Sequence, residues 1–112
     1  MDEAQSSRIL LRSDLSFDPA LAILQRQDKT ILLTAREAAV LRALLQSPRC
    51  WHSADALASR LKRRWPHINA HSIEQIIVGL RRKLGESGKH PTILLSRYGF
   101  GYGIFPQGPK AG

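Results

Sequence analysis

The residues best suited to chemistry lie within positions 69–86, NAHSIEQIIVGLRRKLGE. Wound as a helix at about 100° per residue, this segment places His71, Gln75, Val78 and Arg82 on one side. Imidazole, amide and guanidinium groups can donate hydrogen bonds to phosphates or base edges, and a valine can pack against a thymine methyl group. The spacing therefore predicts a hydrogen-bonding, cationic helix face.

The other side of this helix is apolar. Ile73, Ile77, Leu80 and Leu84 recur at helical spacing and form a stripe that requires a hydrophobic partner. We therefore expect one side in the core and the other at the surface. Gly79 lies beside the outward residues and costs the helix roughly 1 kcal/mol relative to Ala. Close backbone approach to DNA or a partner would offset that cost, and a tolerated exposed position is the alternative interpretation.

Charge favours a polyanionic partner. The 112 residues include 17 Lys and Arg against 9 Asp and Glu, which gives a net charge of +8. Most of the basic residues lie between Arg36 and Lys83. Nucleic acid is favoured over a membrane surface, because the apolar stripe is needed for the core and no apolar run approaches the roughly 20 residues that span a bilayer. The single cysteine and the polar N-terminus, which lacks a secretory signal, predict a cytoplasmic location.

The elements that must position this helix follow from local patterns. Residues 1–7 are expected to be disordered, and 8–33 to form three or four short antiparallel strands, with a helix over 19–27 as the rival interpretation. Three helices are predicted within 34–85. The first has a capping box at Thr34 and Glu37, the second runs from Ser53 to about residue 62, and the third is capped by Asn69 or by Ser72 paired with Gln75.

A β-hairpin is predicted over 92–105, with strands at 92–97 and about 102–105, and a flexible tail over 106–112. The sequence thus predicts one α+β domain over 8–105. Helix, turn, helix and hairpin in this order are the plan of a winged helix-turn-helix, in which the hairpin is the wing.

Other chemistry is not favoured. Cys50, His52, His67 and His71 lack the paired close spacings of zinc sites. Cys50, His52 and Asp55 lie too close in sequence to surround a substrate. The glycines at 99, 101 and 103 are not followed by a helix, so they do not form a dinucleotide-binding loop. We therefore expect no metal, no cofactor and no enzymatic activity.

The runs LTAREAAVLRALLQSP, IEQIIVGLRRKL and ILLSRYGFGYGI resemble the output domain of response regulators of the OmpR/PhoB type. That family reads close to LT-x-x-E at its first helix, V-D-V-H-I-x-x-L-R-R-K-L at its recognition helix and R-G-x-G-Y at its wing. The resemblance covers about residues 8–105. A receiver domain normally precedes this module in the family, but no βα repeat or phosphoacceptor aspartate is recognisable, so no receiver domain is expected. The resemblance implies a DNA-binding module whose recognition helix, about residues 70–85, enters the major groove while the wing meets the adjacent minor groove or backbone.

The sequence departs from the family at the positions that read bases. Ile76, Val78 and Gly79 stand where many members have His, Arg or Lys. Tyr98 replaces a frequent wing arginine, and packing within the wing is its favoured role. Arg97 lies one place earlier and is expected on the opposite face of the strand. The residues predicted to contact DNA are His71, Ser72, Gln75, Val78, Gly79, Arg81 and Arg82 in the helix, Ser96, Arg97 and Tyr98 in the wing, and Arg63 and Arg64 before the helix.

Plain solvation is the alternative role for the outward helix residues and for Arg63 and Arg64. At the level of the whole domain two functions are open. The first is a DNA-binding transcriptional regulator, with double-stranded DNA as partner and pairing of two copies on tandem sites. The second is a protein-interaction module that kept the winged fold and binds RNA polymerase or another regulator. The net charge favours the first.

Overall fold

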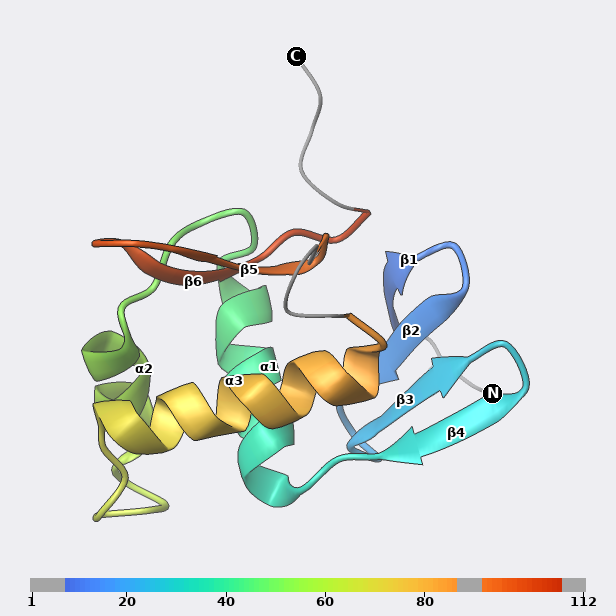
Figure 1. Cartoon of the computed structure of the whole chain (residues 1–112). Helices are drawn as coiled ribbons and strands as arrows, with labels where there is room; N and C mark the ends of the chain where they lie inside the picture. The colour runs from blue at the N-terminus through green and yellow to red at the C-terminus, as the bar shows by residue number, and fades with distance from the viewer. Residues whose placement is uncertain (1–7, 87–91, 108–112) are drawn as a thin grey trace.

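The N-terminal segment folds into a four-stranded antiparallel sheet in the computed structural model, which describes residues 8–86 and 92–107 (Figure 1). Its strands, in spatial order, are β1 (Ile9–Arg12), β2 (Leu15–Asp18), β3 (Ile23–Arg26) and β4 (Lys29–Leu32). Alternation buries Leu11, Leu15, Phe17 and Leu24 against the helices and leaves Leu10 outside. The strand interpretation is therefore confirmed and the helix over 19–27 is wrong.

Three helices follow: α1 (Ala35–Gln46), α2 (Ala54–Leu61) and α3 (Ala70–Leu84). The capping box of α1 is present as predicted, because the Thr34 hydroxyl accepts from the Glu37 amide and the Glu37 carboxylate accepts from the Thr34 amide. Ser53 caps α2.

Of the two caps predicted for α3, the one at Asn69 is confirmed and the one at Ser72 is wrong. Asn69 is the N-cap and pairs with Ser72 in the third helical position, so the box of Ser72 with Gln75 does not form. The helix begins one turn earlier than that box requires, and Ser72 uses its hydroxyl within the cap. Gly85 ends α3 with a φ of 77°, the left-handed conformation that glycine adopts without strain.

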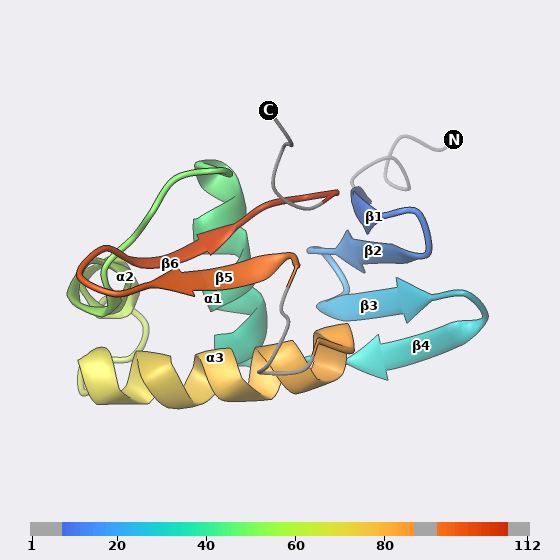
Figure 2. The same ribbon diagram turned by 45° about the horizontal axis from the view of Figure 1, so that its top comes forward.

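The wing is a hairpin of β5 (Leu94–Arg97) and β6 (Gly101–Ile104) that lies alongside α3 and over α1 (Figure 2). A third, unpredicted strand-like segment runs beside β6. The His52 amide donates to Tyr102 O at 2.7 Å, and the Tyr102 amide donates to His52 O at 2.8 Å. The connection between α1 and α2 is thereby tied to the wing.

One hydrophobic core joins the sheet, the helices and the wing. Its fully buried side chains include Phe17 from the sheet, Leu41 and Leu44 from α1, Leu57 from α2 and Ile93 at the start of the wing. The chain past the wing is also held at its start, since the Gln107 amide donates to Leu11 O at 2.6 Å. The flexible tail predicted over 106–112 stays a prediction, because residues 108–112 lie outside the described residues. Residues 1–7, 87–91 and 108–112, where the other disorder and part of a turn were predicted, lie outside the described residues.

Candidate nucleic-acid interface

The two-sided character of α3 is confirmed. Ile73, Ile77, Leu80 and Leu84 are at most 1% exposed and form its inner stripe. The opposite side reaches solvent through His71, Gln75, Val78 and Arg82. Val78 is 56% exposed, so its side chain is accessible to a partner on this face. The predicted core and the predicted outer face therefore lie where the periodicity put them.

The outer face carries a small polar network near its N-terminal end. The amide nitrogen of Gln75 lies 3.2 Å from His71 Nε2, and His71 Nδ1 lies 3.8 Å from the Glu74 carboxylate. These contacts join side chains one helical turn apart, so they hold Gln75 along the helix surface in the absence of a ligand. Glu74, which is also exposed, places a negative charge at the edge of this face.

One flank of α3 packs against the start of α1. Lys83 Nζ donates to Glu37 Oε1 at 2.7 Å and to Leu32 O at 3.1 Å, which joins α3 to α1 and to β4. Burial raises the pKa of the Glu37 carboxyl, but the hydrogen bonds from Lys83 and from the Thr34 amide outweigh it and hold that pKa below its usual range.

Gly79 lies on this same flank. A Cβ atom built on it would come within 2.7 Å of Glu37 Oε2. The close approach that Gly79 permits is therefore to a carboxylate of α1, and the interpretation of Gly79 as an open surface position is wrong. Ile76, next to it, is half-buried and packs on the core.

The other flank of α3 supports the wing. Arg81 Nε donates to Leu94 O of β5 at 3.0 Å, and its Nη2 atom is buried without a hydrogen-bond partner among the described residues. The Arg81 side chain is thus directed at the wing, so a phosphate contact predicted for it would compete with this bond.

Glu86, just past α3, fixes where the wing begins. Its carboxylate accepts hydrogen bonds from the Thr92 amide and hydroxyl and from the amides of Ile93 and Leu94, at 2.6–3.0 Å. Burial raises the pKa of this carboxyl, but the hydrogen bonds from Thr92, Leu94 and Ile93 lower it by more. The pKa of Glu86 is therefore below the usual range. Sequence reasoning missed this residue, because nothing in a single glutamate indicates which distant amides it will meet.

The tip of the wing is exposed. Ser96, Arg97 and Tyr98 all reach solvent, as their predicted contact with DNA requires. Tyr98 is fully exposed, so its favoured role, packing within the wing, is wrong. The Arg97 guanidinium lies 4.2 Å from the centre of the Phe100 ring, in cation–π contact.

A hollow of about 470 Å³ separates the wing tip from the helices. The wing residues 96–102 form one wall, and Ser53, Ala54 and Glu74 form the other. Burial and the negative charge of Glu74 raise the pKa of the Tyr102 phenol at its edge.

A basic cluster lies at the end of α2. Arg63 and Arg64 are both exposed, as predicted. Arg64 lies 4.6 Å from the centre of the Trp65 ring and Arg36 of α1 lies 5.8 Å from it. Lys62 is exposed too, but its Nζ atom donates to Ile68 O at 2.6 Å. Sequence reasoning did not include Arg36, which the fold brings to the cluster from another helix.

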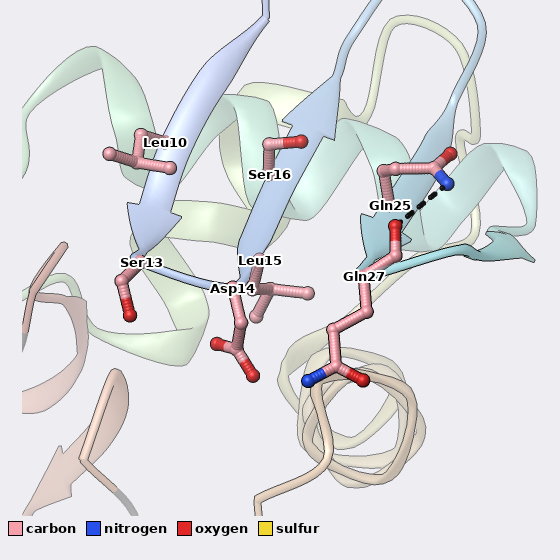
Figure 3. Close-up of a pocket in the computed structure, with 7 residues that line it drawn as sticks. All are labelled: Leu10, Ser13, Asp14, Leu15, Ser16, Gln25 and Gln27. Carbon is pink, nitrogen blue, oxygen red and sulfur yellow. Dashed lines mark hydrogen bonds between the residues drawn. The ribbon is translucent and has the colours of Figure 1, made fainter.

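A second hollow, of about 330 Å³, lies on the outer face of the sheet and is shown in Figure 3. Its lining combines the apolar Leu10 and Leu15 with polar side chains that include Asp14, Ser16 and Gln25. Within residues 8–86 and 92–107, no three His, Cys, Asp or Glu side chains gather in a manner suited to a metal ion. In that same part of the chain, no helix has the length and apolar character needed to cross a membrane.

The fold and the exposed face of α3 define a winged helix-turn-helix domain. Residues 28–104 match the family model described as "Transcriptional regulatory protein, C terminal", and the chain belongs to this family. The resemblance to OmpR/PhoB-type output domains is thereby confirmed.

Solved structures share the fold. The DNA-binding domain of RstA from Klebsiella pneumoniae, in complex with the RstA box, is 21% identical over 88% of this chain and 97% of that one, with a TM-score of 0.72. The DNA-binding domain of CadC from E. coli is 19% identical over 88% and 92%, with a TM-score of 0.73. The DNA-binding domain of CpxR from E. coli is 26% identical over 88% and 96%, with a TM-score of 0.65.

Proposed function

We propose that this transcriptional regulatory domain binds double-stranded DNA, with the outer face of α3 in the major groove and the wing on the adjacent minor groove or backbone. The observation that carries the proposal is the exposure of His71, Gln75, Val78 and Arg82 on a helix whose back is fully buried. A major groove about 12 Å wide accepts such a helix. The RstA relative, which shares this fold, was solved with its DNA box.

The side chains suggest a division of roles. Gln75 is suited to pair with adenine and Val78 to pack on a thymine methyl group. His71 and Arg82 are suited to phosphates, where they fix the register of α3 on the duplex. Backbone amides at the start of α3 are also suited to contact a phosphate. The Ser72 hydroxyl is less available, because it already bonds to Asn69 in the helix cap. The wing residues Ser96, Arg97 and Tyr98 would meet the DNA at the next groove.

Salt dependence tests DNA binding itself. Fluorescence anisotropy with a random duplex, at several salt concentrations, should give a plot of log K against log salt with a slope of about −4.5 if about five phosphates are neutralised. Absence of salt-sensitive binding at micromolar protein would refute the proposal.

Matched substitutions test the division of roles. We expect Gln75→Ala to reduce the difference in affinity between selected and random duplexes, because it removes a base contact. We expect Arg82→Ala to weaken binding to both duplexes equally and to reduce the slope by about one, because it removes a phosphate contact. If both variants change selected and random binding alike, neither residue reads bases.

Other roles remain proposals. Family membership as a transcriptional regulatory domain supports a non-enzymatic function and a cytoplasmic location, and tandem binding of two copies follows from the resemblance. Sedimentation of the domain with one-site and two-site duplexes tests the pairing. No observation on the described residues favours a protein-interaction module over DNA binding. Contact with RNA polymerase would occur in addition to DNA binding.

A further inference from the structure

The wing tip presents two aromatic rings to solvent. Tyr98 is fully exposed and Phe100 is 51% exposed, although large aromatic side chains usually bury most of their area. They flank Gly99, which has a φ of 82° and no neighbouring atom within 4 Å of where its Cβ would lie. The Phe100 amide donates to Arg97 O at 2.9 Å and closes the turn. The turn is thus closed by a backbone hydrogen bond, and both of its aromatic side chains are accessible to a partner.

The tip also holds its one cation against an aromatic ring. The Arg97 guanidinium is 4.2 Å from the Phe100 ring centre, whereas the Tyr98 ring is fully exposed. The wing tip therefore offers a fully exposed phenol ring, while its guanidinium is already in contact with an aromatic ring.

Resting on the proposed DNA binding, we propose that Tyr98 and Phe100 form an aromatic wedge that enters the minor groove and partly unstacks one base step. Aromatic and apolar side chains inserted at the minor groove act in this way, and they favour steps that unstack easily. The wing then selects deformable pyrimidine–purine steps, TA and CA, over stiff A-tracts, whose narrow groove instead attracts arginine.

DNA is the occupant that the surroundings favour. The wing lies alongside α3 (Figures 1 and 2), and Arg81 of α3 donates to Leu94 O of β5, so the wing is attached to the helix proposed to enter the major groove. Arg97 next to the wedge is placed to meet the phosphates that border a groove. A net charge of +8 suits the same polyanion.

The experiment uses duplexes that share one selected major-groove site and differ only in the step opposite the wing: TA, CA, AA within an A-tract, or GC. That step is located first, by moving a 2-aminopurine base along the flank and finding the position where protein raises its fluorescence. For the wild-type protein we expect roughly tenfold tighter binding to TA than to the A-tract, which is the size of one aromatic stacking contact.

Three variants separate the effect of the ring from that of its hydroxyl and from that of a positive charge placed at the same position. Tyr98→Ala should abolish both the step preference and the fluorescence rise, whereas Tyr98→Phe should keep them. Tyr98→Arg should shift the preference to the A-tract and make the salt slope steeper by about one. Leu21→Ala is the control, because Leu21 is 65% exposed in the connection between β2 and β3, far from the wing tip.

The outcomes distinguish the two proposals. If the wild-type protein shows no salt-sensitive binding, both proposals fail. If it binds DNA but Tyr98→Ala retains the same step preference, or if no position of 2-aminopurine responds, only the aromatic wedge is refuted.

Discussion

At the scale of single residues, the Glu37 carboxylate determines what Gly79 contributes to α3. Glycine in a helix normally costs roughly 1 kcal/mol relative to alanine. Here the Cβ of an alanine would come within 2.7 Å of Glu37 Oε2, while Oε1 of the same carboxylate is held by the Thr34 amide and Lys83. An alanine at this position would push the carboxylate away from those partners. Glycine avoids this displacement and lets α1 pack closely on α3.

This contact predicts coupling between the two positions. Gly79→Ala in the wild-type background should raise the free energy of unfolding by less than the roughly 1 kcal/mol expected for a free helix position. In a Glu37→Ala background the same change should give the full gain, because the obstructing carboxylate is gone. Urea denaturation of the four proteins measures the coupling. Equal gains in the two backgrounds would show that the carboxylate moves aside without cost.

Glu86 makes the stability of the domain sensitive to acid. Its hydrogen bonds hold the pKa of the folded-state carboxyl below the usual range despite burial. A lowered folded-state pKa stabilises the fold fully above the pKa of the unfolded chain, about 4.3, and this contribution is lost as the pH falls through the folded-state value.

We therefore expect Glu86→Gln to lower the free energy of unfolding by about 2 kcal/mol at pH 7, since an amide NH₂ would face backbone donors. The difference from wild type should shrink at pH 3. Denaturant titrations at both pH values measure it, with Glu74→Gln as an exposed control expected to change stability by less than about 0.5 kcal/mol. A difference that is equally large at pH 3 would refute the role of the charge.

At the scale of elements, the attachment of the wing depends on close backbone contact. A Cβ on Gly101 would overlap the His52 carbonyl, and Gly101 has a φ of 110°. Gly99, also at positive φ, has open space around it. The two glycines thus share a backbone conformation that other residues rarely adopt, and only one of them is also confined by a neighbour.

Substituting each glycine separates these effects. Gly99→Ala should cost about 1 kcal/mol from its backbone conformation alone. Gly101→Ala should cost at least about 2 kcal/mol more, because the segment around His52 must also move away from β6. Thermal or urea unfolding measures both costs. Similar costs for the two variants would mean that the His52 segment shifts freely.

The elements that carry their own signals were predicted well. The inner stripe of α3, the cap at Thr34 and the hairpin all follow from spacing within one segment. The strand-like contact of His52 was missed, because one bridging residue has no alternating pattern. The roles of Gly79 and Arg81 were also missed for a physical reason. Helical periodicity gives the direction of each side chain, but the neighbours it meets on either flank depend on how α1 and the wing pack.

At the scale of the whole molecule, the distance of each basic side chain from α3 limits which of them can contact the same stretch of DNA. The domain measures 38 × 36 × 21 Å, so its longest dimension is close to one turn of duplex, about 34 Å. The cluster at the end of α2 lies on the same side of the molecule as the start of α3, and the sheet lies on the opposite side (Figures 1 and 2). Arg63 and Arg64 are therefore better placed than the sheet cations to contact phosphates beside the α3 site.

The salt dependence of binding decides between phosphate contact and plain solvation for this cluster. We expect Arg63→Ala combined with Arg64→Ala to weaken binding to all duplexes alike and to reduce the slope of log K against log salt by about two. Arg8→Ala combined with Lys29→Ala removes the same charge from the sheet and should leave the slope within about half a unit, because those residues do not meet the duplex. If both pairs change the slope equally, net charge alone acts, and if neither does, Arg63 and Arg64 are only solvated.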